Sequence, residues 1–188
     1  MNEKFYYRSP ISNIDIKKYL KNVNIINYGD LGHYDKITDL LPKQIDACVI
    51  FVKTTTHLSG HWCAILRKNQ NIYYFDAYGL RVDKNLFFQE NSFIRNQLNQ
   101  NIPHLSYLLN DAIKRGFKVF FNEVKYQDDD KAFGSATCGR WVVYRILKHF
   151  EGYTPKKFKN HIKKLVEKYE LKPDFIITKL IKTEQEKY

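Results

Sequence analysis

The chain has 188 residues, of which 44% are hydrophobic and 15% aromatic, a composition too apolar for a disordered protein and a length suited to one domain with its own core. With 31 Lys and Arg against 20 Asp and Glu, the formal net charge is +11, so the surface is expected to be basic. The longest apolar run, residues 48–52, is far shorter than the roughly 20 residues that span a bilayer, and the opening MNEKFYYRSP has no apolar signal-peptide region. We therefore expect a single domain over 1–188 that neither crosses a membrane nor is secreted.

Three cysteines, Cys48, Cys63 and Cys138, are widely spaced along the chain. An odd number leaves at least one thiol unpaired, and the spacing does not suggest a disulfide framework. We therefore expect a reducing, intracellular compartment.

The first predicted element is a short amphipathic helix capped by Ser12 or Asn13. It follows from apolar residues at i, i+3, i+4 and i+7, namely Ile16, Tyr19, Leu20 and Val23. Residues 27–42 have the composition of a loop with one helical turn. After this loop the pattern changes to strands.

Three strands are predicted next, over 47–53, 61–67 and 72–76. The polar turn Lys68-Asn69-Gln70-Asn71 joins the last two as a β-hairpin. Pairing Arg67 with Ile72 across this turn places Cys63 opposite Asp76. His61 and Asp76 then become diagonal neighbours on one face of the sheet.

The rest of the chain is mostly helical. A helix over 105–113 ends at Gly116, a strand covers 117–125, and a helix over 138–150 ends at Gly152. Thr154 and Pro155 open a further helix, and a last helix runs on from Pro173. The predicted class is α+β, with a central, mostly antiparallel sheet between an N-terminal helix and a helical C-terminal part.

Cys138 stands where a loop becomes a helix. A thiol there has its thiolate stabilised by the helix dipole and by backbone N–H groups, which makes it nucleophilic near neutral pH. The same N–H groups can bind the oxyanion that forms when an acyl group is attacked, and Gly139 lets the backbone approach a substrate closely. The alternative is a small apolar core residue, as free cysteines often are.

His61 and Asp76 supply the other half of a Cys–His–Asp site. An acid beside an imidazole orients it as a general base, and we expect the contact to use Nδ1. Taken singly, His61 is better explained as a half-buried strand histidine bonded to the backbone, and Asp76 as a carboxylate at a strand end.

Gln127 ends the strand that precedes the Cys138 loop. Its side-chain amide is a candidate oxyanion donor beside the Cys138 N–H, with Asn122 or backbone alone as the alternative. An exposed loop glutamine is the simpler interpretation. The four candidates together are stronger evidence for a catalytic site than any one of them alone; they are His61, Asp76, Gln127 and Cys138.

Cys63 is a rival nucleophile, but a strand residue has no helix dipole beside it, so packing beneath the site or modulating it is the expected role. The spacing His-x3-His-x-Cys of His57, His61 and Cys63 suggests a zinc alternative. It matches no strong zinc pattern and no CxxC accompanies it. We expect no metal and no organic cofactor.

Four segments, GHWCAIL, YYFDAYG, NEVKYQ and SATCGRWVVYRIL, resemble cysteine proteases of the adenovirus maturation protease type and the SUMO- and ubiquitin-like-protein-specific proteases. Those families share the chain order His, Asp or Asn, Gln, Cys on an α+β fold. The resemblance maps these roles onto His61, Asp76, Gln127 and Cys138 with Gly139. It also implies that Trp62 walls the substrate groove.

The resemblance covers roughly residues 45–150, and beyond it residues 153–188 form a basic helical part. The gap between Gln127 and Cys138 is longer than is usual in the family and holds Asp128, Asp129 and Asp130. The family's preference for small residues, often Gly, at the cleaved bond is implied by resemblance alone.

The function implied is a cysteine endopeptidase with a protein or peptide substrate. The compact chain and its richness in Lys, Asn, Ile, Tyr and Phe, whose codons are A/T-rich, favour a viral enzyme. Such an enzyme would process capsid or other structural proteins during virion maturation, as a monomer in the virion and the host cytoplasm. Removal of a ubiquitin-like modifier is the alternative within the family. A non-catalytic, basic, nucleic-acid-binding or structural protein is the alternative outside it.

Residues 138–188 hold 13 Lys and Arg against six Asp and Glu, which is +7 of the total +11. The adenovirus enzyme works in the presence of viral DNA, so the resemblance implies weak, sequence-independent DNA binding. The alternative is a solvated helix face. The lysines assigned to such binding are Lys156, Lys157, Lys159, Lys163 and Lys164.

Overall fold

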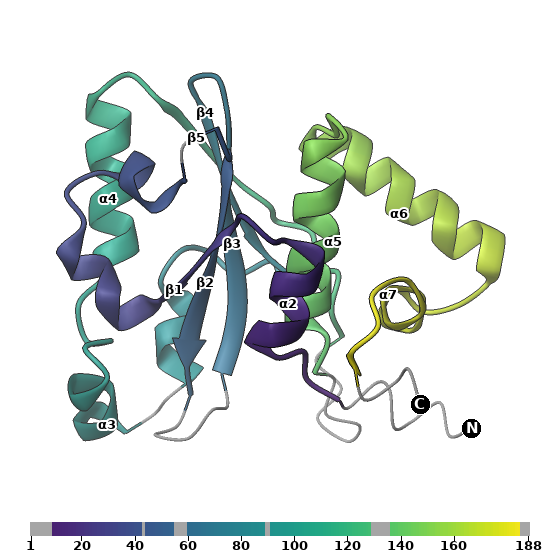
Figure 1. Ribbon diagram of the computed structural model, residues 1–188, viewed down its shortest axis with the longest axis horizontal. Coiled ribbons are helices and arrows are strands. Elements are labelled where there is room, and N and C mark those ends of the chain that lie inside the picture. The colour runs from purple at the N-terminus through teal and green to yellow at the C-terminus, as the bar shows by residue number, and fades with distance from the viewer. Residues whose placement is uncertain (1–8, 43, 55–59, 89–90, 129–135, 185–188) are drawn as a thin grey trace. The chain divides into compact units, whose positions relative to one another are not determined.

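The chain folds into two compact units that alternate along the sequence, shown as ribbons in Figure 1. The first unit consists of residues 1–21, 77–79 and 124–188, and the second of residues 22–76 and 80–123. The computed structural model describes residues 9–42, 44–54, 60–88, 91–128 and 136–184. Among these residues, no helix has the length and apolarity needed to cross a membrane. The single-domain interpretation of 1–188 stays a prediction.

A five-stranded sheet in the order β1-β2-β3-β4-β5 forms the centre of the second unit. Its strands are β1 (Asn24–Asn27), β2 (Ala47–Lys53), β3 (Gly60–Lys68), β4 (Asn71–Asp76) and β5 (Lys118–Phe121). The inner pairs β2–β3 and β3–β4 are antiparallel, whereas the outer pairs β1–β2 and β4–β5 are parallel. The α+β class is confirmed, and the sheet is mixed because each edge strand is linked to its neighbour through a crossover.

Helices of the second unit lie in the two crossovers. They are the 3₁₀ helices η1 (Tyr28–His33), η2 (Ile37–Leu40) and η3 (Lys84–Phe88), and the α-helices α3 (Ser92–Gln97) and α4 (His104–Lys114). The apolar face of α4 packs on η1, η2 and β5, and Figure 1 shows it along one face of the sheet. The predicted C-cap is confirmed, since Gly116 follows α4 with a φ of +90° that favours glycine.

Four helices make up most of the first unit: α2 (Asn13–Tyr19), α5 (Cys138–Phe150), α6 (Pro155–Tyr169) and α7 (Pro173–Leu180). Ser12 caps α2 by accepting from the backbone N–H of Asp15. Thr154 caps α6 by accepting from Lys157 N, with Pro155 in the first turn as predicted. The helices α2, α6 and α7 pack together through contacts with α5 and with each other.

The helix α5 is buried along its first nine residues, and its first turn contacts segments near both ends of the described chain. The guanidinium of Arg140 is fully buried, and its Nη1 donates to Ile181 O at 2.5 Å and its Nη2 to Ser9 O at 3.0 Å. The next residue, Trp141, is fully buried and packs on Tyr126, with 5.3 Å between ring centroids. These contacts fix the position of α5 within its unit.

Candidate active site

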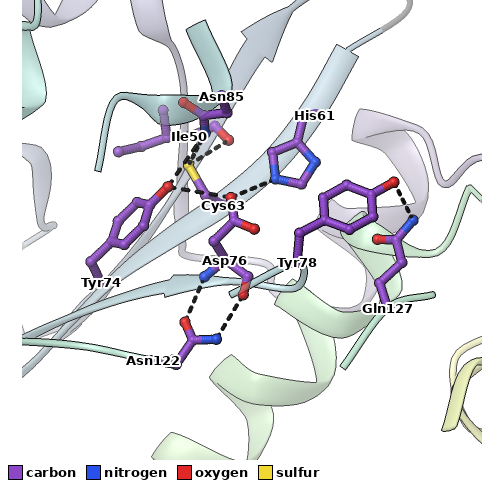
Figure 2. Close-up of polar contacts among 9 residues, drawn as sticks. All are labelled: Ile50, His61, Cys63, Tyr74, Asp76, Tyr78, Asn85, Asn122 and Gln127. Carbon is purple, nitrogen blue, oxygen red and sulfur yellow. Dashed lines mark hydrogen bonds and ion pairs between the residues drawn. The ribbon is translucent and has the colours of Figure 1, made fainter. Parts of the chain in front are cut away.

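The histidine and the aspartate of the predicted pair lie on neighbouring strands of the second unit and are hydrogen-bonded (Figure 2). His61 Nε2 lies 2.7 Å from Asp76 Oδ2, and both side chains are buried. The β3–β4 ladder pairs Arg67 with Ile72 and Cys63 with Asp76, which is the register predicted from the turn. The diagonal relation of His61 to Asp76 is therefore confirmed.

The bond uses Nε2 of His61, so the expectation that Asp76 contacts Nδ1 is wrong. Diagonal neighbours on adjacent strands are about 7 to 8 Å apart, and Nε2 is the ring nitrogen farther from the backbone, which lets it span that separation. A carboxylate only accepts hydrogen bonds, so this contact places the ring proton on Nε2 and makes Nδ1 the basic nitrogen.

A buried polar network supports the Asp76 carboxylate from the side opposite His61 in Figure 2. Tyr74 Oη donates to Asp76 Oδ2 at 3.3 Å, and Asn85 Nδ2 donates to Tyr74 Oη at 3.3 Å. Burial raises the pKa of Tyr74 well above its usual value, so the hydroxyl keeps its proton and acts as a donor. The network therefore fixes the orientation of the carboxylate.

The side chain of Asn122 is hydrogen-bonded to the backbone of Asp76. Its Oδ1 accepts from Asp76 N at 2.8 Å and its Nδ2 donates to Asp76 O at 2.7 Å. These two bonds continue the pairing that β5 ceases to give after Phe121. The structure thus favours a positioning role for Asn122 over the oxyanion role considered from the sequence.

Cys63, the rival nucleophile, is fully buried and pairs across the strands with Asp76. Its Sγ lies 3.8 Å from Ile50 O and 3.9 Å from Asn85 Nδ2. Burial, and secondarily the Asp76 carboxylate, raises the pKa of the Cys63 thiol well above its usual value. A buried thiol that keeps its proton is a poor nucleophile, so the geometry favours the packing role.

The zinc alternative required His57, which lies outside the described residues, together with His61 and Cys63. Within the described ranges, no group of three or more His, Cys, Asp or Glu side chains is arranged to hold a metal ion. His61 instead pairs with Asp76.

Cys138 is the first residue of α5, as predicted, and its side chain is buried but for a small exposed fraction of 8%. The first intrahelical bond runs from Trp141 N to Thr137 O. The N–H groups of Cys138 and Gly139 therefore precede the first N–H that has an acceptor within the helix, and they lie at the positive end of the helix dipole. Such N–H groups can stabilise a thiolate or an oxyanion.

Gln127 is buried, with 1% of its surface exposed, so the interpretation as an exposed loop residue is wrong. Gln127 also does not end a strand, since the strand predicted over 117–125 is observed as β5, which ends at Phe121. Gln127 is held instead by Ala77, whose carbonyl accepts from the N–H groups of Tyr126 and Gln127 at 2.8 and 2.9 Å. Its Nε2 donates to Tyr78 Oη at 3.0 Å (Figure 2), which orients the side-chain amide.

Trp62, expected to wall the substrate groove, is 5% exposed and packs on Phe51, with ring centroids 4.2 Å apart. That role stays a prediction, and the burial favours packing. An aromatic neighbour that the sequence did not single out is Phe88, whose ring meets His61 edge-on at 5.4 Å and is 43% exposed. The only sequence signal for it was the apolar pair Phe87-Phe88 in a polar segment.

The four predicted catalytic residues fall into two pairs. His61 and Asp76 belong to the second unit, and Gln127 and Cys138 belong to the first. Each pair is assembled by contacts inside its own unit. The joining of the four into one site stays a prediction.

No protein-family model matches the chain, and no curated protein matches it. Among solved structures, the chain is similar to the ASFV pS273R protease with a TM-score of 0.50 and 10% sequence identity, over 94% of this chain and 68% of that chain. A selenomethionine structure of the same protease gives a TM-score of 0.46 at 10% identity, over 78% of this chain and 60% of that chain. The first of these shows that the α+β fold of the chain is the fold of a viral protease.

Proposed function

We propose that the chain is a cysteine endopeptidase in which Cys138 is the nucleophile and His61 the general base. The observation that carries the proposal is the buried 2.7 Å bond between His61 Nε2 and Asp76 Oδ2, because an imidazole held in one tautomer by an acid is prepared to accept a proton. The placement of Cys138 at the start of α5 supports the assignment of the nucleophile. The fold shared with the ASFV protease supports the reaction class.

In the proposed reaction, Nδ1 of His61 takes the proton of Cys138, and Sγ attacks the carbonyl carbon of the peptide bond. The negative charge on the carbonyl oxygen is stabilised by the Cys138 N–H and by the Gln127 amide. The C–N bond then breaks as His61 gives its proton to the leaving amine, and a thioester remains on Sγ. Water deprotonated by His61 attacks the thioester, releasing the acid and restoring the thiol.

We propose structural proteins of a virus as the substrates, cleaved in the virion or the host cytoplasm. The support is the likeness of fold to an ASFV protease. Cleavage of a ubiquitin-like precursor by the purified chain, with no cleavage of capsid proteins, would favour the alternative of a deconjugating protease.

The test of the reaction class is labelling with a thiol-reactive electrophile carried on a Gly-Gly peptide, followed by mass-spectrometric mapping. We expect the label on Cys138 and none on Cys48 or Cys63, which are fully buried. Burial also raises the pKa of the Cys48 thiol to about 12, which lowers its reactivity further. A chain that stays unlabelled, and that cleaves no protein, would favour the non-catalytic binding protein.

A second proposed property is weak DNA binding through α6. A cleft of about 400 Å³ opens on this helix, lined by Tyr153, Thr154, Lys156, Lys157, Asn160, His161 and Lys164. Lys157 Nζ lies 4.2 Å from the centre of the Tyr153 ring. A group of lysines on one helix suits binding to a phosphate backbone, which does not depend on base sequence.

Changing Lys156, Lys157, Lys159, Lys163 and Lys164 to Gln is expected to abolish binding to duplex DNA. Each neutralised phosphate contributes about −0.9 to the slope of log K against log salt. Any binding that the variant keeps must therefore have a shallower slope than that of the wild-type chain. A titration at low and moderate salt measures both quantities. The matched control changes five exposed lysines of the second unit, Lys36, Lys68, Lys84, Lys114 and Lys118, which alters the net charge equally. Equal loss in both variants, or no binding at low salt, would contradict a site on α6.

A further inference from the structure

Asp174, in the first turn of α7, has a buried carboxylate on which three donors converge. Its side chain is 2% exposed. Oδ1 accepts from Thr137 Oγ1 at 2.5 Å and from Trp141 Nε1 at 2.8 Å, and Oδ2 accepts from Asp128 N at 2.7 Å. All three partners are donors, so the carboxylate form is the one that satisfies them.

The three donors belong to the two segments that carry the proposed oxyanion donors. Asp128 follows Gln127 directly, Thr137 precedes Cys138 directly, and Trp141 lies one turn further along α5. Residues 128 and 137 are nine positions apart in the sequence. One carboxylate therefore ties the end of the Gln127 segment to the start of the helix that bears the thiol.

The bonds divide between the two carboxylate oxygens. Oδ2 accepts from the backbone next to Gln127, and Oδ1 accepts from two side chains at the start of α5. A displacement of Asp174 would hence change the separation between the Gln127 segment and the Cys138 N–H. Catalysis that relies on preorganised donors is sensitive to such a change, and a misplacement of about 1 Å can cost about 100-fold in rate.

We propose that Asp174 is a positioning residue for the oxyanion hole, which sets the separation between the Gln127 amide and the Cys138 N–H. The inference rests on the proposed function and extends it to a residue of the basic C-terminal part, outside the segments that carry the family resemblance. Asp174 touches neither substrate nor the reacting atoms in this role. It acts through the backbone at residue 128 and through the first turn of α5.

The first test is Asp174→Asn in the full chain, assayed with a fluorogenic peptide that carries Gly-Gly before the cleaved bond. The amide keeps one oxygen but turns an N–H₂ group toward one set of donors, so one of the two segments is released. We expect kcat to fall about 10- to 100-fold with KM little changed. Gln127→Ala sets the scale, since loss of one oxyanion donor costs about 100- to 1,000-fold in kcat.

A double variant separates positioning from plain stability. If Asp174 acts partly through Gln127, then Asp174→Asn must cost less in the Gln127→Ala background than in the wild-type chain. An undiminished cost in that background would overturn the inference. If Asp174→Asn does not fold, Thr137→Val removes one donor at nearly constant volume and is expected to lower kcat in the same way.

The matched control is Asp15→Asn, in the same unit. Asp15 is 6% exposed and accepts from Ser12 N at 3.0 Å, Ser12 Oγ at 2.6 Å and Glu184 N at 2.8 Å, so it is also buried and accepts the same number of hydrogen bonds as Asp174. We expect Asp15→Asn to lower Tm while kcat stays within about twofold. If kcat falls equally in the two variants, Asp174 contributes to stability alone and the inference is wrong.

Amide hydrogen exchange gives a readout that needs no substrate. Exchange at Asp128 is expected to accelerate at least about tenfold in Asp174→Asn and to stay unchanged in Asp15→Asn. Unchanged exchange in Asp174→Asn would overturn the inference, even in an active enzyme. A wild-type chain that neither cleaves peptides nor labels at Cys138 would instead contradict the proposed function, and the exchange result would still report on the tie itself.

Discussion

Replacing Cys138 with alanine is expected to abolish peptide cleavage and to leave the fold intact. In the proposed reaction Sγ forms the covalent bond to the substrate carbon, and alanine offers no nucleophile in its place. Removal of the nucleophile from a catalytic unit of this kind costs about a millionfold in turnover. The measurement is hydrolysis of the Gly-Gly fluorogenic peptide, with thermal unfolding followed by circular dichroism to verify the fold.

The matched control for this change is Cys63→Ala, which removes a thiol that is fully buried in β3. This variant is expected to keep most of the activity and to lose about 1 kcal/mol of stability, as most single substitutions do. Equal loss of activity in the two variants, or loss in Cys63→Ala alone, would remove Cys138 from the role of nucleophile.

His61→Ala is expected to cost nearly as much as the loss of Cys138. Residues that act as one catalytic unit have non-additive effects, so the double variant with Cys138→Ala should be no worse than either single variant. The measurement is kcat/KM for the three variants with the same peptide. A His61→Ala enzyme that keeps more than about a hundredth of the wild-type rate would contradict the assignment of His61 as general base.

Asp76→Ala provides the graded comparison within the same prediction. It removes the group that orients the imidazole while leaving base and nucleophile in place, so about 10- to 100-fold more activity should survive than in His61→Ala. The substitution also leaves the buried hydroxyl of Tyr74 and the imidazole of His61 without the acceptor they share. Tm is therefore expected to fall as well, and activity must be measured well below it.

The hairpin shows how much of the site a local pattern can predict. The turn residues 68–71 fixed the pairing of Arg67 with Ile72, and the period of two then placed His61 diagonal to Asp76 without any tertiary information. The start of α5 was predictable for a similar reason, because an apolar face at helical spacing begins at a single point in the chain. The ring nitrogen of His61 was not, since it depends on a side-chain separation that no sequence pattern records.

The missed features depend on contacts between residues far apart in the sequence. β1 is only four residues long and is defined by its parallel pairing with β2, so it has no pattern of its own. The strand predicted over 117–125 ends at Phe121, because from Asn122 on a side chain rather than the backbone pairs with β4 at Asp76. The burial of Gln127 comes from Ala77 and Tyr78, about fifty positions earlier, and a one-dimensional pattern carries no such information.

The buried guanidinium of Arg140 has a consequence for how the chain can be trimmed or fused. It lies two positions after Cys138, and its acceptors include the carbonyl oxygens of Ser9 and Ile181. A chain shortened past either residue would leave the buried guanidinium with one hydrogen bond fewer, at a cost of about 1 to 3 kcal/mol for each bond lost. Tags and fusion partners are therefore best attached outside residues 9–181, because Arg140 ties α5 to both of these distant carbonyls.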